Sequence, residues 1–385
     1  MKRERVVVAM SGGVDSSVAA ALLVEAGYEV IGITMQLWPK EWCNLPPTPK
    51  SCCSMRDAED ARSVAAQLGI PFYVLDLAAE FQEKVIGYFA ASYEQGLTPN
   101  PCIACNDHIK FGALMRQAEL LGASKVATGH YARVRHDAAS GRHLLQSGAD
   151  LSKDQSYVLF GLTQQQLGRA LFPIGHLSKA EVRALAQRQG FRVFDKPDSQ
   201  DICFLRGGGK QEFLAQRARP QEPGPIVDTS GRVLGAHRGT LGFTIGQREG
   251  LGIAVGHPLY VLEVDAAGNR LIVGSREELL QRGCQLERMN WIAQPPAVGT
   301  SRTVEIKIRA HHPLTPATVE VTGEQSARLY FYEAQSAVTP GQAAVLYDGD
   351  TVLGGGWIAK TRTHIAGTTD IRQQTTVHNN QPVTV

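Results

Sequence analysis

Residues Ser11 to Ser16 read Ser-Gly-Gly-Val-Asp-Ser, a run that combines two glycines with hydroxyl side chains and one carboxylate. A buried-strand pattern over 5–10 precedes the run and a helical pattern follows it, so the motif falls at a strand-to-helix turn. Glycine lets the backbone approach an anion closely, and the free N–H groups of a helix N-terminus favour phosphate. The motif therefore predicts a phosphate-binding loop rather than only a tight turn.

Asp15 is the one member of this motif that phosphate alone would repel. A carboxylate in this position is explained if Mg²⁺ lies between it and the phosphates, so we expect Asp15 to hold Mg²⁺. Neither G-x-x-x-x-G-K-[ST] nor G-x-G-x-x-G occurs at this turn, which separates it from the common nucleoside triphosphatase and dinucleotide loops.

The chain contains seven cysteines, an odd number that is unevenly spaced. They are Cys43, Cys52, Cys53, Cys102, Cys105, Cys203 and Cys284. In a reducing compartment this pattern argues against a disulfide framework and for chemistry or metal binding at some of them. Cys105 follows a loop stiffened by Pro99 and Pro101 and precedes a helix expected near Ile109, whose dipole would favour the thiolate.

Cys203 ends a polar stretch far downstream of Cys105. Two cysteines distant in sequence and flanking one phosphate site suit sulfur transfer: one carries a persulfide, and the other attacks it to release sulfide or form a disulfide.

Strand and helix patterns alternate over residues 5–134, which predicts a parallel sheet covered on both faces. The expected strands span 5–10, 28–37, 72–75 and 125–134. The expected helices span 15–26, 81–93 and 111–121, with one more that Ser54 caps and another that opens with a capping box at Ser178 and Glu181.

The chain of 385 residues is long enough for two to three domains of about 150 residues. We expect a catalytic α/β domain at 1–205, a central β-rich domain at 206–285, a C-terminal β-barrel at 286–368 and a disordered tail at 369–385. The barrel is indicated by short alternating strands such as 303–309, where Val304, Ile306 and Ile308 share one face.

Composition narrows the setting of the protein. The net charge is only +2, so any nucleic-acid-binding surface must be a local patch rather than the whole molecule. No stretch approaches the roughly 20 apolar residues of a membrane span, and the N-terminus lacks a signal-peptide core, so we expect a cytoplasmic protein without membrane contact.

With the glycine motif and the cysteines in view, the chain resembles two nested families. The loop is similar to that of the N-type ATP pyrophosphatases, which adenylate a carbonyl oxygen and release pyrophosphate. The whole chain, from about residue 5 to 365, resembles the bacterial tRNA-specific 2-thiouridylases. The matching segments are 9–17, 52–54, 100–106, 128–131, 153–157, 199–204, 244–248, 250–252, 340–342 and 354–356.

This resemblance implies a Rossmann-like α/β fold of the adenine nucleotide alpha hydrolase type and an ATP-dependent exchange of sulfur for the C2 oxygen of the wobble uridine in tRNAs for Lys, Glu and Gln. Cys105 is then the nucleophile and Cys203 the persulfide carrier, the two able to join as a disulfide. The implied ATP ligands are Ala9, Met10, Ser11, Gly12, Gly13, Val14, Asp15, Ser16, Met35 and Gly129. The implied base ligands are Asn100, Pro101 and Cys102, and the implied tRNA contacts are His130, Lys153, Asp154, Gln155, Arg309, Ala310 and Gln342. A cysteine desulfurase or sulfur-relay protein would supply the persulfide.

Several alternatives stay open at this stage. Cys102 stands where some family members carry an aspartate proposed as general base, so that role has no residue here. Cys102, Cys105 and Cys203 could instead hold a four-iron–four-sulfur cluster with one open iron. His130 could be a core histidine and Lys153 a solvated charge. A protein that binds ATP and RNA without turnover is the other function class.

Overall fold

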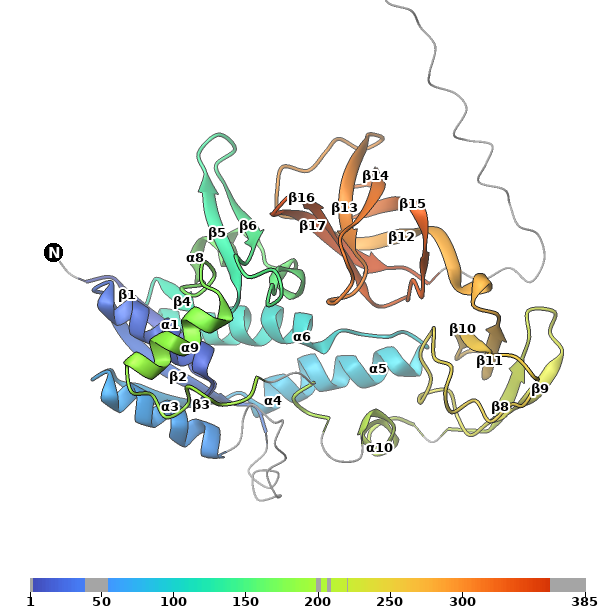
Figure 1. Cartoon of the computed structure of the whole chain (residues 1–385), viewed down its shortest axis with the longest axis horizontal. Helices are drawn as coiled ribbons and strands as arrows, with labels where there is room; N and C mark the ends of the chain where they lie inside the picture. Colours follow the sequence, from blue (N-terminus) through green and yellow to red (C-terminus); the bar gives the residue numbers. More distant parts are fainter. Residues whose placement is uncertain (1–2, 39–54, 199–201, 206–208, 220, 361–385) are drawn as a thin grey trace, which may run out of the picture.

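The computed structural model describes residues 3–38, 55–198, 202–205, 209–219 and 221–360. It consists of an α/β unit, a small central β unit and a β-barrel (Figure 1). Ser54, the expected helix cap, and Cys43, Cys52, Cys53 and the expected tail lie outside the described residues.

The α/β unit begins with alternating strands and helices. In chain order these elements are β1 (Arg5–Ala9), α1 (Val14–Glu25), β2 (Glu29–Gln36), α3 (Met55–Gln67), β3 (Phe72–Asp76), α4 (Ala78–Phe81), the π-helical η1 (Gln82–Gly87), α5 (Tyr88–Glu94), α6 (Pro101–Ala104), the π-helical η2 (Cys105–Ala113), α7 (Leu114–Leu120) and β4 (Lys125–Ala127). The unit continues with β5 (Ala132–Asp137), β6 (Arg142–Ser147), the 3-10 turn η3 (Ser156–Leu159), α8 (Gln164–Arg169), β7 (Ala170–Leu171), α9 (Lys179–Arg188) and α10 (Gly209–Ala215).

The predicted parallel sheet is confirmed, with strand order β3-β2-β1-β4-β7. Successive side chains of a strand point to opposite faces, so β1 contributes to two cores. Val6 and Val8 pack in the core that contains residues of α1, α3 and α9, whereas Val7 and Ala9 pack in the core that contains residues of α7 and the barrel. The all-apolar run of β1 is thus explained by burial on both faces.

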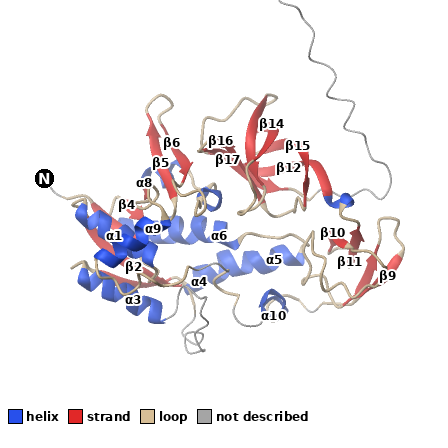
Figure 2. Ribbon diagram, viewed as in Figure 1, coloured by secondary structure: helices blue, strands red, loops and turns tan. Residues whose placement is uncertain are grey.

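The strand expected over 125–134 is two strands. β4 ends at Ala127, and β5 begins at Ala132 and pairs antiparallel with β6. The hairpin of β5 and β6 stands beside the barrel in Figure 2 and joins its sheet through the pairing of Thr351 with Gln146. The change of direction after Ala127 places Thr128–Tyr131 at the carboxyl edge of the parallel sheet.

From Gly224 onward the described chain is built mainly of strands, as predicted, whereas the first helix after residue 206, α10, lies inside the bounds expected for the β-rich central domain. The elements from Gly224 onward are β8 (Gly224–Val227), β9 (Val233–His237), β10 (Tyr260–Asp265), β11 (Arg270–Gly274), the 3-10 turn η4 (Glu277–Leu279), β12 (Leu280–Trp291), β13 (Ser301–Lys307), β14 (Thr315–Gly323), β15 (Ser326–Ser336), β16 (Ala343–Asp348) and β17 (Thr351–Ile358). Strands β8 to β11 form the central sheet, and pairing of β12 with β17 closes the barrel. Val304, Ile306 and Ile308 are all buried in it.

Candidate functional site

The glycine motif lies at the point where the order of the parallel sheet reverses. β1 is flanked by β2 and β4, so the loops after β1 and β4 lie next to each other at the carboxyl edge of the sheet, where such folds bind ligands. A Cβ on Gly129 would lie 2.7 Å from both the carbonyl carbon of Asp15 and the backbone nitrogen of Ser16. The structure therefore brings together two regions predicted to bind one nucleotide. Met35, near the end of β2, is half-buried and packs against the core that contains Ala9 of β1.

The motif forms a compact loop around the start of α1. Ser16 Oγ accepts from the Ser11 backbone N–H at 3.2 Å and donates to the Gly13 carbonyl at 3.1 Å. Gly12 has φ of +73°, and a Cβ there would overlap the Asp57 carbonyl oxygen. Gly13 is the N-cap of α1, and no side chain caps that end. The first-turn N–H groups of α1 are thus available to an anion.

Asp15 in the first turn of α1 contacts one hydroxyl and one ammonium group. Tyr131 donates its hydroxyl proton to Asp15 Oδ1 at 2.8 Å, and Lys179 Nζ lies 2.8 Å from both Asp15 oxygens. Burial and the neighbouring Asp15 charge raise the pKa of Tyr131, so the hydroxyl stays protonated as the donor. The carboxylate predicted to hold Mg²⁺ is therefore balanced by a lysine in this structure.

Asp198 extends this network toward the cysteine segment. Its carboxylate lies 2.8 Å from both Lys153 Nζ and Lys179 Nζ and 3.0 Å from Arg183. Burial opposes ionisation, but the hydrogen bonds and charges of Lys153 and Lys179 lower the pKa of Asp198 to about 2. One lysine, Lys179, thus bridges the phosphate loop and the stretch that leads to Cys203.

Lys196 fixes the other side of the phosphate loop. Its ammonium group donates to the Gly12 carbonyl at 2.9 Å and to Asp57 and Asp60 of α3 at 2.6 Å. Burial lowers the pKa of Lys196, but the two carboxylates more than compensate and raise it. The loop, the start of α3 and residues 196–198 are consequently one hydrogen-bonded unit.

The helix that carries Cys102 and Cys105 begins earlier than predicted. It starts at Pro101, not near Ile109, because Asn100 caps it by accepting the Cys102 backbone N–H at 3.1 Å and Pro101 occupies its first turn. Cys105 consequently lies one turn inside the continuous helix formed by α6, η2 and α7, at the first residue of the π-helical segment. The predicted location of this thiol at a helix start is therefore corrected by about one turn.

The two cysteines predicted to transfer sulfur pack against the same apolar cluster. Cys105 and Cys203 both contact a core built from residues of α4, η1, α5, η2 and α10. Phe204, next to Cys203, is buried in it, with its ring centroid 5.0 Å from those of Phe89 and Phe213. The structure thus brings both cysteines to one cluster, whereas Cys102 is exposed. Cys284 is buried in the barrel, where burial raises the pKa of its thiol to about 12.

Four of the predicted tRNA contacts are engaged within the protein. His130 is buried, with Nδ1 2.7 Å from Thr128 Oγ1, and burial lowers its pKa well below the usual value. Gln155 Oε1 accepts the Tyr131 backbone N–H at 3.0 Å. The Asp154 carboxylate is paired with Lys307 at 3.0 Å and is almost fully buried. The fourth, Lys153, pairs with Asp198 as described above.

The remaining predicted contacts lie on the barrel. Arg309 is exposed after β13, and Ala310 packs against the core shared with the α/β unit. Gln342 Nε2 donates to the Thr98 carbonyl at 2.9 Å, which joins the barrel to the loop before Asn100. The RNA contacts of all seven residues stay predictions.

Two further findings concern metals and membranes. No group of three or more His, Cys, Asp or Glu side chains within the described ranges is arranged to hold a metal ion. In the same part of the chain no helix combines the length and apolar character needed to cross a membrane.

Sequence reasoning did not find three residues of the hydrogen-bonded network beside the Ser11–Ser16 loop, namely Tyr131, Lys179 and Asp198. Lys179 carried a local signal, because a lysine in the first turn of a helix opposes the helix dipole. Its partner Asp15 lies 164 residues away in the chain, so no local pattern could pair the two.

Comparison with known proteins gives matches along almost the whole chain. The families tRNA methyl transferase HUP domain, tRNA methyl transferase PRC-barrel domain and Aminomethyltransferase beta-barrel domain match residues 4–207, 211–275 and 281–358. The tRNA-specific 2-thiouridylase MnmA of Geotalea uraniireducens is 51% identical over 360 residues, which cover 93% of this chain and 95% of that protein. The tRNA-specific 2-thiouridylase MnmA of Moorella thermoacetica is 51% identical over 352 residues, covering 91% and 98%. Among solved structures, the NMN synthetase of Francisella tularensis aligns over 51% of this chain and 67% of that chain, with 19% identity and a TM-score of 0.32.

Proposed function

The chain belongs to the family of tRNA-specific 2-thiouridylases, and from this premise we propose that it is a tRNA-uridine 2-sulfurtransferase that consumes ATP. The observation that carries the proposal is identity of about one half to the MnmA proteins over more than nine-tenths of the chain. The geometry adds support, because an uncapped helix N-terminus and a glycine-lined loop stand at the switch point of the sheet.

ATP would bind with its phosphates at the start of α1. The proposed ligands are the backbone and hydroxyl groups of Ser11–Ser16, with Ala9 and Met10 before them and Met35 and Gly129 at the adenosine end. A bound Mg²⁺ would screen the phosphate charge, and Asp15 is the residue that would hold it, since Mg²⁺ commonly takes one or two carboxylates together with phosphate oxygens. Lys179, which pairs with Asp15 at 2.8 Å, is the cation that would lie beside these phosphates.

The first reaction joins the C2 oxygen of the target uridine to the α-phosphorus of ATP and releases pyrophosphate. The base would have to leave its stack to reach this site, and Asn100, Pro101 and Cys102 are the proposed contacts. The exposure of Cys102 fits a residue that meets an incoming base.

The second reaction replaces the activated oxygen with sulfur. The terminal sulfur of a Cys203 persulfide bonds to C2, and AMP leaves with the former C2 oxygen. The Cys105 thiolate then attacks Sγ of Cys203, so that the old sulfur–sulfur bond breaks, a Cys105–Cys203 disulfide forms and the thiocarbonyl remains on the base. The common cluster that both cysteines contact supports this pairing. A reductant must open the disulfide before the next turnover.

Within the described ranges no group of three or more His, Cys, Asp or Glu side chains is arranged to hold a metal ion, and an iron–sulfur cluster on Cys102, Cys105 and Cys203 stays an untested alternative. We therefore derive no step through a cluster. Iron and acid-labile sulfide in protein purified without oxygen provide the direct check, and about four of each per chain would favour the cluster.

The proposed partners are the tRNAs for Lys, Glu and Gln and a cysteine desulfurase or sulfur-relay protein, with the cytoplasm as the place of action. His130, Lys153, Asp154, Gln155, Arg309 and Ala310 remain the proposed tRNA contacts, and Gln342 is set apart from them because its amide nitrogen donates to the Thr98 carbonyl. Because the carboxylate of Asp154 is buried, its backbone is the part proposed to meet RNA.

The deciding experiment is thiolation of unmodified tRNA with MgATP and a persulfide donor, followed by nucleoside mass spectrometry. We expect 2-thiouridine from the parent protein and none from Cys105→Ser. Cys284→Ser, in a buried thiol of the barrel, is the matched control and should keep activity. ATP and tRNA binding without product in any variant would instead favour a binding protein without turnover.

A further inference from the structure

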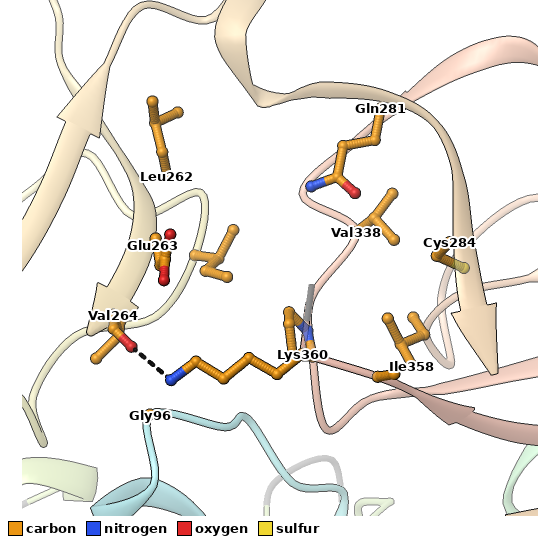
Figure 3. Close-up of a pocket in the computed structure, with 12 residues that line it drawn as sticks. Gly96, Leu262, Glu263, Val264, Gln281, Cys284, Val338, Ile358 and Lys360 are labelled. Carbon is orange, nitrogen blue, oxygen red and sulfur yellow. Dashed lines mark hydrogen bonds between the residues drawn. The ribbon is translucent and has the colours of Figure 1, made fainter. Parts of the chain in front are cut away.

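The loop that follows α5 lies where all three units of the protein meet. Gly96 packs so closely on the Val264 carbonyl of β10 that a Cβ would overlap it. Lys360, after the last barrel strand, donates to the carbonyls of Gln95 at 3.3 Å and Val264 at 3.4 Å. Figure 3 shows Lys360 reaching across to Val264, with Gly96 below the bond. The cavity at this junction measures about 30 Å³, so the units pack closely there.

A turn of the barrel forms hydrogen bonds with the next residues of the same loop. This turn, Pro340–Gln342, is called the barrel turn below. Its Pro340 carbonyl accepts the Thr98 backbone N–H at 2.9 Å, and Gln342 Nε2 donates to the Thr98 carbonyl at 2.9 Å. Both backbone polar groups of Thr98 are thus bound by the barrel. Gly341, with φ of +88°, makes this possible, because a Cβ there would lie 2.9 Å from Leu97 Cβ.

The chain between Thr98 and the helix that carries Cys102 and Cys105 has little conformational freedom. Pro99 and Pro101 fix their own φ angles and restrict the residues before them. Asn100, between the prolines, is held as the N-cap of α6 by its bond to Cys102. A shift of Thr98 is therefore passed on to the start of α6 instead of being absorbed by a flexible linker.

We propose that Gln342 is a positioning residue: through Thr98, the barrel turn sets where Asn100, Cys102 and Cys105 lie relative to the nucleotide. The inference rests on the proposed function and deepens it. The family resemblance implies that Gln342 contacts tRNA, whereas here its amide nitrogen donates to the protein's own loop. An RNA that docks on the barrel would therefore be coupled to the placement of the target-base residues through this turn.

The test removes the donor without changing side-chain size. Gln342→Met should lower the turnover number for thiolation about five- to tenfold, the range expected for losing one hydrogen bond, while the Kd for tRNA changes less than twofold. Hydrogen exchange of the peptide 97–105 should become about tenfold faster. Gly341→Ala should act in the same direction while leaving the Gln342 side chain unchanged.

Gln325→Met is the matched control, since Gln325 is an exposed glutamine at another turn of the same barrel. It should leave turnover, tRNA affinity and exchange unchanged. Weaker tRNA binding in Gln342→Met with unchanged exchange over 97–105 would overturn the proposal in favour of a direct RNA contact. Unchanged turnover and exchange would overturn it as well.

Failure of the proposed function gives a different result. If the parent protein forms no 2-thiouridine, the function fails, yet the exchange of 97–105 in Gln342→Met and Gly341→Ala still reports whether the barrel turn holds the loop. If exchange is faster in both variants and the parent does not thiolate tRNA, the barrel turn still holds the loop at Thr98. Only the effect of the barrel turn on thiolation is then rejected.

Discussion

The carboxylate of Asp107 lies on the same helix as Cys105, two residues further on. It is largely buried, and its Oδ1 has no hydrogen-bond partner in the described structure. Burial raises the pKa of Asp107 to about 7. The native state thus holds this proton up to about pH 7, whereas the unfolded chain, with an ordinary aspartate pKa near 4, has already released it. The contribution of Asp107 to folding stability must therefore fall as pH rises from about 4 to 7 and stay low above that.

Asp107→Asn should remove this pH dependence. We expect the variant to be more stable than the parent by about 2–4 kcal/mol at pH 8 and nearly equal at pH 4, because only the ionised carboxylate is penalised. Urea unfolding at both pH values measures the difference. Asp137→Asn, at a half-buried aspartate that accepts from the Ser140 hydroxyl, should instead be neutral or destabilising. A constant difference between Asp107→Asn and the parent at all pH values would contradict the argument.

Lys179 is the residue whose loss should most directly affect the nucleotide. Lys179→Met leaves Asp15 and Asp198 without their shared cation and removes a charge from the proposed phosphate site. We expect kcat/KM for ATP to fall about 10- to 100-fold, the range for a hydrogen bond between charged groups. Pyrophosphate release with tRNA present measures it.

Lys125→Met is the control for Lys179→Met, since Lys125 is also a part-buried lysine and donates to the Gly168 carbonyl at 2.6 Å. Thermal melts of both variants separate misfolding from a specific defect. Pyrophosphate release at the parent rate in Lys179→Met would exclude Lys179 from the phosphate site.

At the scale of elements, a turn or helix end could be predicted from the sequence where residues close to it in the chain determine it. It could not be predicted where pairing with a distant segment determines it. The strand-to-helix turn at Ser11–Ser16 and the helix cap at Ser178 are set by residues within a few positions, and both were predicted; Ser178 indeed accepts the Glu181 backbone N–H. The break after β4 was missed although Gly129 interrupts the strand-like residues on either side of it, and pairing with β6 decides where the second strand begins. The early start of α6 was missed although Asn100 and Pro101 are ordinary helix-start residues.

The close approach of two elements gives a sharp prediction at this scale. Gly129→Ala would insert a methyl group between the loop after β4 and the first turn of α1, where 2.7 Å separates the Cβ position from Ser16 nitrogen. Because both are backbone segments, the loop must move, and we expect ATP affinity to fall at least tenfold with a modest loss of stability. Isothermal titration with MgATP measures the affinity.

Gly87→Ala is the control for Gly129→Ala. Its Cβ would meet only the Gln82 carbonyl at an ordinary 3.4 Å, and alanine favours a helix more than glycine does. Unchanged ATP affinity in Gly129→Ala would mean that nucleotide binding does not depend on the fit between these two elements.

At the scale of the molecule, one apolar core joins the α/β unit to the barrel. Val7 and Ile31 of the parallel sheet share it with Val345, Tyr347 and Val352 of β16 and β17. Figure 1 shows the barrel standing over the long helices of the α/β unit, close to the hairpin of β5 and β6. The sequence patterns predicted an α/β unit and a β-barrel but not the core that they share. An apolar pattern indicates which face of a helix or strand is buried, but not which element packs against that face.

A shared core predicts that the two units unfold together. Tyr347 is fully buried in it, and its hydroxyl lies 3.2 Å from Ser156 Oγ of the α/β unit. Tyr347→Ala should destabilise the protein by about 3–5 kcal/mol, as expected for a buried aromatic, and should lower the unfolding midpoints of both units equally. Hydrogen exchange followed by mass spectrometry through a urea titration reads the sheet and the barrel separately. Tyr332→Ala, at a tyrosine that is 56% exposed on β15, should shift neither by more than about 0.5 kcal/mol. If the barrel peptides of Tyr347→Ala lost protection at lower urea while β1 and β2 kept the parent midpoint, the shared core would in fact be two adjoining cores. The barrel would then be coupled to the helix that carries Cys105 through the barrel turn alone.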